Sequence, residues 1–568
     1  MAAGLPLNLY TLLAPWLLPI IESVLLVAAV ALTFYSRHRI PHFLSYNSGF
    51  SRLARRKKLS ILLVGVATLA LRLAIIPAWG IPRPSWHDEF SFLLAADTFA
   101  HGRLTNPPHP MWKHFEGFHI IQKPTYMSMY PPGQGLILAA GERLGNPWIG
   151  QLVVTAMMCS CLCWMLQGWM PAPWALLGAC LAVLRFALLS YWVNSYFGTS
   201  LPALGGMLLL GAYPRIRRKA RWGGALVMAL GLAILANTRP YEGLIFSLPI
   251  LMALLWWGAE QRRFPSVVLL RRIVMPAAIV LLVTFAGMGY YFWRVTGSPM
   301  EMPYTVNRQT YAVAPYFVWQ KPRAEPVYRH AEMRDFYVNR ELRSYQEGST
   351  FWGFVRRLAK RFGTLWLFFV GPVLSLPLFA AAWIFRDLKM RLPLCIAGAV
   401  IAGNIIETWT LVHYLAPAVG LLYLLLMQGM RHLRLWRHRN REVGHGLVRA
   451  VCLVSVAMVV LRVAAMASGI RIEPPRPTGL KKRNAIEEQL RLMPGKQLVI
   501  VHYAPQHVPH EDWINNGADI DGEKIVWARD MGDKENLELV LYFKDRKIWR
   551  VQADDPAPRL EPYPASPQ

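Results

Sequence analysis

Long apolar runs separated by short connections most strongly constrain how this chain can fold. Twelve runs of bilayer-spanning or slightly shorter length occur in the first 470 residues. A bilayer core offers no hydrogen-bond partners to an open backbone, so each run is expected to be a helix. The runs lie near 11–34, 59–80, 148–169, 171–192, 196–213, 222–237, 241–258, 273–293, 363–385, 392–408, 411–430 and 446–468. A content of 54% hydrophobic against 17% charged residues fits the same class, a polytopic membrane protein.

Basic residues between these runs predict how the chain is oriented in the membrane. Five connections carry 24 Lys and Arg residues against three acidic ones, and twelve crossings place all five on one side. Such connections stay in the cytoplasm, which predicts a multi-pass protein of the plasma (inner) membrane. They are 36–58, 215–221, 259–272, 386–391 and 431–446. The loops 81–132 and 294–362 and the tail from 471 are then expected on the extracytoplasmic face.

The same distribution of charge excludes nucleic acid as a partner. The net charge of +28 would suit a nucleic-acid-binding protein, but its excess lies in the short connections. Residues 471–568 carry 15 basic and 16 acidic residues and are close to neutral. Membrane lipids are therefore the expected surroundings of the basic excess.

Neither the cysteines nor the N-terminal segment indicates a further functional site. All six cysteines lie in apolar runs, and three of them, Cys159, Cys161 and Cys163, alternate along one run. Helix positions i and i+2 point to different faces, so these thiols are not expected to converge on a metal. The first apolar run lacks a basic segment before it and is interpreted as an uncleaved span.

Two domains are predicted: a membrane domain over 1–470, all-α with about twelve spans, and a small extracytoplasmic α/β domain over 471–568. Within the tail, 481–493 suits a helix and 497–503 a buried strand. Further strand candidates are 524–528, 537–543 and 547–552, and the proline-rich stretch 474–477 suits a hinge. The apolar segment 133–145 is too short to span and is expected to be re-entrant or interfacial.

Two adjacent acids, Asp88 and Glu89, follow the second apolar run in the sequence SWHDE (85–89). One interpretation is a capping pair, with Ser85 and Asp88 starting an interfacial helix over 90–100 that Gly102 ends. The other is catalytic, because a carboxylate fixed at the membrane surface suits a general base. Both acids are candidate catalytic residues.

A second group of charged residues, Arg239 and Glu242, lies in the sequence NTRPYEG (237–243) between two apolar runs. Ionisable residues at this depth are costly unless they pair or face a cavity. They either pair with each other at a helix start or form a binding site in which Arg239 holds a phosphate.

Loop 294–362 is long and interleaves aromatic rings with cations, of which Arg308 and Lys321 are candidate substrate-binding residues. Long ordered loops are usually functional. Its rings either face a sugar and a phosphate or form an interfacial aromatic belt. The rings belong to Tyr304, Tyr311, Tyr316, Phe317, Trp319 and Tyr328.

Histidines crowd the first loop, at 87, 101, 109, 114 and 119, together with Asp88, Glu89 and Glu116. Histidine and carboxylate ligands would suit Zn²⁺ or Mn²⁺, so a divalent metal is considered, but no motif fixes its ligands. The tail residues His502, His507 and His510 are interpreted as solvated loop residues.

Three segments together carry a resemblance: WHDEF (86–90), KPTY (123–126) and YPPGQ (130–134). They resemble motifs of the C-type (GT-C) membrane glycosyltransferases, in particular the protein O-mannosyltransferases and the lipid A aminoarabinose transferases. The resemblance implies that Asp88 is the catalytic carboxylate, that Lys123 contacts the donor phosphate, and that Tyr130 lies at the substrate. An additional N-terminal span and threonine in place of the second proline of Lys-Pro-Pro are the departures.

An extracytoplasmic site decides the class of donor. Nucleotide sugars are cytoplasmic, and no cytoplasmic loop is large enough to bind one. The expected activity is therefore inverting transfer of a sugar from a polyprenyl-phosphate donor to a hydroxyl of a glycan, lipid or protein. A lipid or polysaccharide transporter, or flippase, is the alternative, and it would need charges deep in the membrane.

Overall fold

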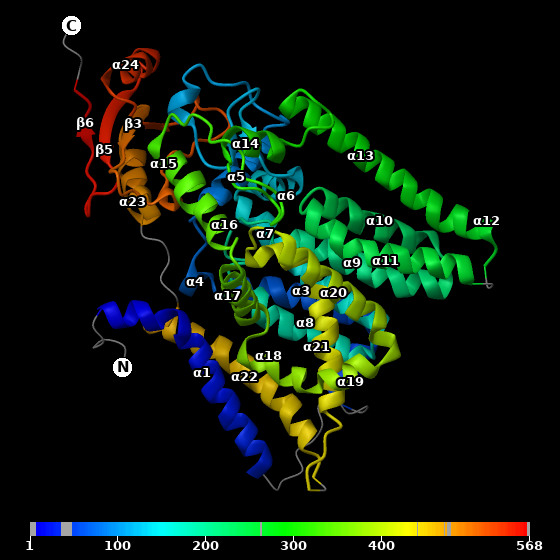
Figure 1. Ribbon diagram of the computed structural model, residues 1–568. Coiled ribbons are helices and arrows are strands. Elements are labelled where there is room, and N and C mark those ends of the chain that lie inside the picture. Colours follow the sequence, from blue (N-terminus) through cyan, green and yellow to red (C-terminus); the bar gives the residue numbers. More distant parts are fainter. Residues whose placement is uncertain are drawn as a thin grey trace.

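A computed structural model describes residues 7–35, 48–261, 264–439, 441–470, 472–473 and 479–564, and each of the twelve apolar runs is helical in it. The predicted hinge at 474–477 lies outside the described residues. Most of the chain is a bundle of helices, and a small sheet lies at one end of it (Figure 1). The predicted combination of a helical membrane part and a C-terminal sheet is confirmed at this level.

Seven helical segments of the described chain are long and apolar enough to cross a bilayer. An eighth is formed if α17 (Phe351–Phe369) and the segment Gly371–Arg386, bent by 97°, count as one span. The number of twelve spans thus remains a prediction. The seven are Trp16–Tyr35 of α1 (Leu7–Tyr35), α7 (Pro147–Trp169), α11 (Pro240–Glu260), Ser266–Thr296, Leu388–Ile406, Val412–Leu433 and α22 (Val443–Ala467).

The remaining apolar runs form shorter or more polar helices. Lys57, Lys58 and Arg72 make α3 (Lys57–Ala74) more polar than a typical span, and α9 ends in Arg217, Arg218 and Lys219. α8 and α10 are apolar but short. Their bounds are α8 (Ala172–Phe186), α9 (Ser200–Lys219) and α10 (Trp222–Ala236).

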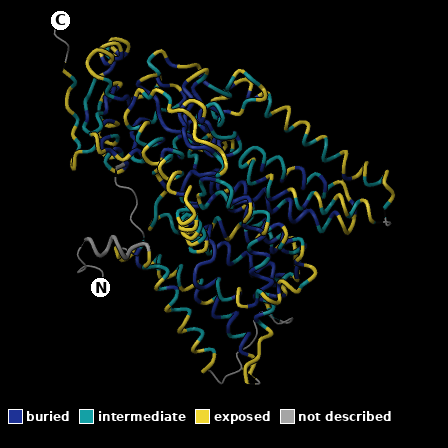
Figure 2. Tube along the Cα trace, viewed as in Figure 1, coloured by how far each residue is buried: buried dark blue, intermediate teal, exposed yellow. Residues whose placement is uncertain are grey.

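Burial separates central helices from peripheral ones. The apolar window of α7 is 72% buried by other parts of the protein, whereas that of Ser266–Thr296 is only 6% buried. Figure 2 shows the same contrast between the dark central helices and the exposed long helix along one flank. That flank consists of α12 (Ser266–Leu269), the π-helical turn η2 (Leu270–Val274) and α13 (Met275–Thr296). The apolar exposed surface of α13 is suited to lipid.

The first large loop folds into short elements on top of the bundle. The predicted interfacial helix is present as α5 (His87–Ala100), and Gly102, with a φ of +74°, follows its end. The segment expected to be too short to span is α6 (Pro132–Arg143), a helix of 12 residues. The other elements of this loop are η1 (Trp112–Phe115), β1 (Ile120–Ile121) and β2 (Met127–Ser128), and the short helices α2 (Gly49–Arg55) and α4 (Ile76–Trp79) lie before it, on either side of α3.

The second large loop is also ordered and is mostly helical. It contains a π-helix, η3 (Asp335–Leu342), which is a rare form often found at functional sites. The flanking elements are α14 (Pro303–Tyr311), α15 (Ala331–Arg334) and α16 (Arg343–Glu347). Further along the chain are α18 (Gly371–Ser375), η4 (Leu376–Ala380), α19 (Ala381–Arg386), η5 (Leu388–Met390), α20 (Arg391–Ile406), η6 (Val412–Ala418) and α21 (Val419–Leu433).

The C-terminal region, residues 479–564, forms a four-stranded sheet in the order β4-β3-β5-β6. β3 is parallel to both β4 and β5, so Val499 lies beside Trp527 and Trp549, and β6 is antiparallel to β5. The elements are α23 (Gly479–Leu492), β3 (Gln497–His502), η7 (Pro509–Glu511), β4 (Ile525–Arg529), α24 (Asp533–Tyr542), β5 (Lys547–Gln552) and β6 (Glu561–Pro562).

One predicted strand is wrong, because residues 537–543 belong almost entirely to α24. The buried residues Asn536, Leu539 and Phe543 recur every three or four positions, which is the spacing of a helix face. Asp533 and Glu535 in the first turn also favour the helix dipole.

The C-terminal region packs directly on the first large loop. Leu94 and Phe115 of the loop share a buried cluster with Ile500 and Val526 of the sheet. Arg529, at the end of β4, donates to the backbone oxygen of Glu116 at 2.9 Å. The carboxyl ends of the parallel strands therefore face the loop that carries the acid pair, on the side where ligands bind in open α/β sheets.

Candidate functional site

Two cavities meet at the acid pair. A large cavity of about 910 Å³ lies among α1, α8, α22 and the start of α5, and a small cavity of about 530 Å³ lies under the second large loop. Three residues line both of them: Asp88, Leu411 and His510. The Asp88 carboxylate thus lies where two bound molecules could approach each other.

Asp88 is held by three side chains of the first loop. The Tyr130 hydroxyl donates to Oδ1 of Asp88, His87 Nδ1 lies 3.2 Å from Oδ2, and His119 Nε2 lies 3.6 Å from Oδ1. Burial acts to raise the pKa of Asp88, but His119, His87 and the Tyr130 hydrogen bond outweigh it and hold that pKa well below its usual value. The carboxylate is therefore ionised at neutral pH, as a general base must be.

His119 faces Asp88 from a left-handed backbone conformation, with a φ of +61°. Residues other than glycine seldom adopt this region, and such strain is often found at functional sites. Burial lowers the pKa of His119 to about 3, so its ring is neutral near pH 7. Its backbone oxygen accepts from the Ser91 hydroxyl of α5 at 2.7 Å, which ties it to the helix of Asp88.

Glu89 points away from Asp88 and closes the start of α5. Its carboxylate accepts from the backbone N–H groups of Ser85 at 2.7 Å, Trp86 at 3.1 Å and Tyr196 at 2.9 Å. Burial raises the pKa of Glu89 to about 7, although these three donors act against the rise. The capping acid is thus Glu89, and the predicted pairing of Ser85 with Asp88 is wrong.

Arg239 brings a cation to the small cavity. Its guanidinium lies 4.3 Å from the ring centre of Tyr414 and 3.6 Å from the Glu242 carboxylate, which also lines this cavity. The expected ion pair is therefore present and lies on a cavity wall, while binding of a phosphate by Arg239 stays a prediction. Asp88, Tyr130 and Arg239 line the same small cavity.

Arg308 is the second cation of the small cavity. It pairs with Glu341 of η3 at 2.5 Å, donates to the Ala314 backbone oxygen at 2.9 Å, and lies 4.7 Å from the Trp409 ring. Its Nε atom is buried and has no partner among the described residues. Arg308 thus joins α14 to the π-helix on the wall of the cavity.

The two predicted lysines lie elsewhere. Lys123 Nζ lies 4.6 Å above the ring of Trp112, whose ring also contacts Arg329 at 4.7 Å. Lys321 is exposed. Neither lysine lines the two cavities around Asp88.

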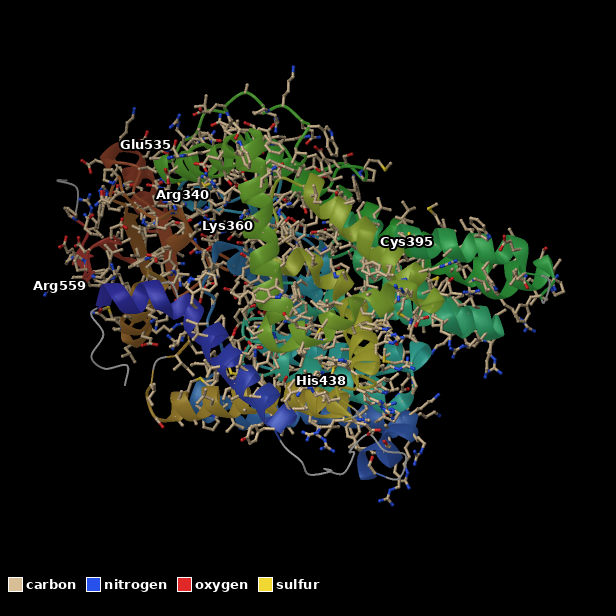
Figure 3. All side chains as sticks on the ribbon, turned by 60° about the horizontal axis from the view of Figure 1, so that its bottom comes forward. Arg340, Lys360, Cys395, His438, Glu535 and Arg559 are labelled. Atoms are coloured by element: carbon tan, nitrogen blue, oxygen red, sulfur yellow. The ribbon has the colours of Figure 1, made fainter. Side chains whose placement is uncertain are left out.

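Several residues of the cavities were missed from the sequence. Phe336, Arg340 and Glu341 of η3 line the small cavity, and no motif marks this π-helix. Figure 3 shows Arg340 on the same side of the molecule as Glu535 of the C-terminal region. The interpretation of the tail histidines as solvated is wrong for His507, which is buried, and His510 lies at the centre of the site.

Among the described residues, two groups of histidines and acids are close enough to hold a metal ion. One consists of His87, Asp88 and His119, whose ligand atoms lie within 4.8 Å of one another, and the other is Asp97, His101 and Glu142. Two imidazoles and a carboxylate are a ligand set that suits Zn²⁺. Of the crowded histidines, only His87 and His119 reach Asp88.

No protein-family model matches the chain, and no curated protein matches it. Solved structures, by contrast, do match the chain. ArnT from Cupriavidus metallidurans in the apo state is 12% identical, over 89% of this chain and 93% of that one, with a TM-score of 0.49. ArnT bound to undecaprenyl phosphate is 12% identical over 88% and 92%, with a TM-score of 0.46.

An oligosaccharyltransferase from Archaeoglobus fulgidus, tethered to an acceptor peptide, is 11% identical over 90% of this chain and 69% of that one, with a TM-score of 0.45. ArnT and the oligosaccharyltransferase are glycosyltransferases of the GT-C fold, the class that the sequence motifs resemble.

Proposed function

We propose that this protein is an inverting glycosyltransferase that moves a sugar from a polyprenyl-phosphate donor to an acceptor hydroxyl. The observation that carries the proposal is the position of Asp88 on a wall common to two cavities. Transfer between two substrates needs one base that both can reach. The small cavity adds Arg239, an arginine suited to a phosphate, within the same walls as Asp88.

In the proposed reaction, Asp88 takes the proton of the acceptor hydroxyl. The hydroxyl oxygen attacks the anomeric carbon as the bond between that carbon and the phosphate oxygen breaks, which inverts the anomeric configuration. The lipid phosphate leaves with the bonding electrons, and Arg239 stabilises its charge. Tyr130 and His87 hold the carboxylate in place, which leaves Asp88 oriented for one direction of attack.

The donor class follows from the proposed location on the extracytoplasmic face, away from nucleotide sugars. The large cavity, lined mainly by apolar residues of membrane helices such as Leu18, Leu181 and Met458, offers a path for an apolar chain to the same carboxylate. Residues 471–568 would form a separate domain. This domain would lie on the extracytoplasmic face, over the site. The acceptor, whether glycan, lipid or protein, is to be identified by assay.

A transporter is the second candidate function, and deep charges are the observation on its side. Glu22 and Arg185 lie 3.7 Å apart in the wall of the large cavity. Glu22, however, accepts from the Val373 backbone N–H at 3.1 Å, and Arg185 donates to the backbone oxygens of Leu367 and Phe368. These contacts fix a helix break, so the pair favours a structural role.

The test is transfer by purified protein from a radiolabelled polyprenyl-phosphate sugar to a membrane lipid extract. Asp88→Asn removes the base without changing the size of the side chain, and transfer should fall by about 10²- to 10⁴-fold. Undiminished transfer by Asp88→Asn would rule out this role for the carboxylate. Movement of lipid without glycosyl transfer would favour the transporter.

A divalent metal, if one is needed, would be held by His87, Asp88 and His119. Bound there, it would supply positive charge beside the departing phosphate. We expect His119→Ala to lower the amount of zinc retained after purification, measured by elemental analysis. Transfer that survives complete chelation would show that these residues act as side chains alone.

A further inference from the structure

The C-terminal region contributes one side chain to both cavities around Asp88. This residue is His510, in the short turn η7 that follows β3, and it is the residue of this region that lines both the large and the small cavity. Its sequence neighbour Asp512 accepts from the Tyr503 hydroxyl and from Arg529, each at 2.7 Å. Those two bonds fix the segment that carries His510.

His510 contacts the imidazole ring of His87, which faces Asp88. Its Nδ1 lies 2.9 Å from His87 Nε2, and the two rings are stacked, with centres 5.2 Å apart and planes 16° from parallel. Trp86 and Phe336 meet the His510 ring edge-on, each with a centre 5.5 Å away. The His510 ring therefore has little freedom to turn.

The partners of His87 determine where its hydrogen lies. His87 Nδ1 lies 3.2 Å from Asp88 Oδ2, within ion-pair distance, and it has no hydrogen-bond partner among the described residues, so the Asp88 oxygen is the polar atom it faces. An ionised carboxylate only accepts, so a His87 ring that holds no metal ion and carries a single hydrogen must carry it on Nδ1. Its Nε2 is then an acceptor, and His510 Nδ1 must be the donor that faces it.

We propose that His510 is a positioning residue for the transfer proposed above: by donating to His87 Nε2 it holds His87 in the Nδ1–H tautomer and so orients the Asp88 carboxylate. The inference rests on the proposed function. It also gives the C-terminal region a specific role, because the membrane helices and their loops supply Asp88 and His87 but not this donor.

Two substitutions of similar chemistry separate this role from a general packing role. The amide nitrogen of asparagine can take the place of His Nδ1, whereas that of glutamine reaches towards the place of Nε2. His510→Asn should therefore keep most of the wild-type kcat. His510→Gln and His510→Ala should lose about 10-fold or more in kcat, with little change in the KM for the polyprenyl-phosphate sugar.

His502→Gln is the matched control. His502 belongs to the same region and bonds to Asp530 at 3.0 Å, but it lines neither of the two cavities around Asp88. All variants are compared as full-length protein, and their thermal unfolding midpoints are measured beside the transfer rates. We expect the control to match the wild type in both measurements, and His510→Asn to keep most of the wild-type kcat.

Each outcome decides the inference. If His510→Gln and His510→Ala turn over like the wild type while Asp88→Asn is inactive, the positioning role is wrong and the proposed function stands. If His510→Asn loses as much kcat as His510→Gln, donation from the Nδ1 position is wrong. If Asp88→Asn itself is active, the proposed function fails, whatever the histidine variants do.

Discussion

The neighbouring acids Asp88 and Glu89 have different roles in this site. Successive helix positions are 100° apart, so Asp88 and Glu89 leave α5 in different directions. Asp88 meets ring nitrogens and a phenol hydroxyl at the cavity wall, whereas Glu89 meets three backbone N–H groups. Asp88 is therefore available to a substrate, and Glu89 is occupied by the protein.

Exchanging each acid for its amide should separate the two roles. Glu89→Gln leaves one carbonyl oxygen for three N–H donors, so we expect a loss of about 1–3 kcal/mol in the free energy of unfolding. Asp88→Asn should keep the unfolding midpoint and lose transfer. Thermal unfolding in detergent measures the first effect, and a Glu89→Gln midpoint equal to that of the wild type would contradict it.

Arg239 allows a second prediction at this scale. Arg239→Gln removes the charge that is expected to face the leaving phosphate, so kcat should fall about 10²-fold. Arg334→Gln is the control, because Arg334 pairs with Glu325 at 2.7 Å on the surface and lines neither cavity. Equal rates for the two variants would exclude Arg239 from the reaction.

Several residues of the candidate site could be found from the sequence, and the rest could not, for physical reasons. Asp88 and Arg239 stand out because charged groups at a membrane surface are costly unless they pair or face a cavity, and Tyr130 stands out through its motif; all three line one cavity. Lys123 was predicted through a motif, but its position on Trp112 depends on how the first loop folds. His510 meets His87 across 423 positions, a distance that no local pattern encodes.

At the scale of elements, close backbone crossings position the cavity walls. The turn η6 carries His413 of the large cavity and Tyr414 of the small one, and it packs against α9 at Gly206. A Cβ atom on Gly206 would lie 2.0 Å from the Pro417 backbone oxygen. Only glycine allows so close an approach. The helix α9 was predictable from its apolar pattern, but its contact with η6 was not.

The crossing gives a prediction with an internal control. Gly206→Ala must push η6 away from α9, which should cost about 1–3 kcal/mol in stability and lower the transfer rate. Gly287→Ala in α13 adds the same methyl group where nothing lies within 4 Å, and it should leave both unchanged. If Gly206→Ala is as stable as Gly287→Ala, η6 can move away from α9 without a loss of stability, and the prediction is wrong.

At the scale of the whole molecule, the C-terminal region and the basic connection between α21 and α22 lie at opposite ends. Figure 1 shows α24 at the top of the view and this connection at the bottom. Twelve helical runs were predictable from hydropathy alone, whereas the orientation in the membrane that the charges indicate stays a prediction. The number of crossings was not predictable, because burial by neighbours lets shorter and more polar helices such as α3 and α9 take part in the bundle.

This orientation can be tested with single cysteines. The six native cysteines lie in α7, α8, α20 and α22, so Glu535→Cys in α24 and His438→Cys between α21 and α22 would each add a thiol away from those four helices. A membrane-impermeant maleimide applied to intact cells should label Glu535→Cys, and it should label His438→Cys only after permeabilisation. Unsubstituted protein corrects for background, and the reverse pattern would contradict the proposed orientation.

The span of 423 positions between His87 and His510 also affects how the protein is made. Asp88 is synthesised early, whereas His510, which contacts its neighbour His87, is synthesised much later. In the proposed function, a chain cut short before His510 would carry Asp88 and His87 without this donor and would transfer the sugar slowly. Full transfer would thus begin only after the segment that carries His510 has been made and has packed on the first large loop.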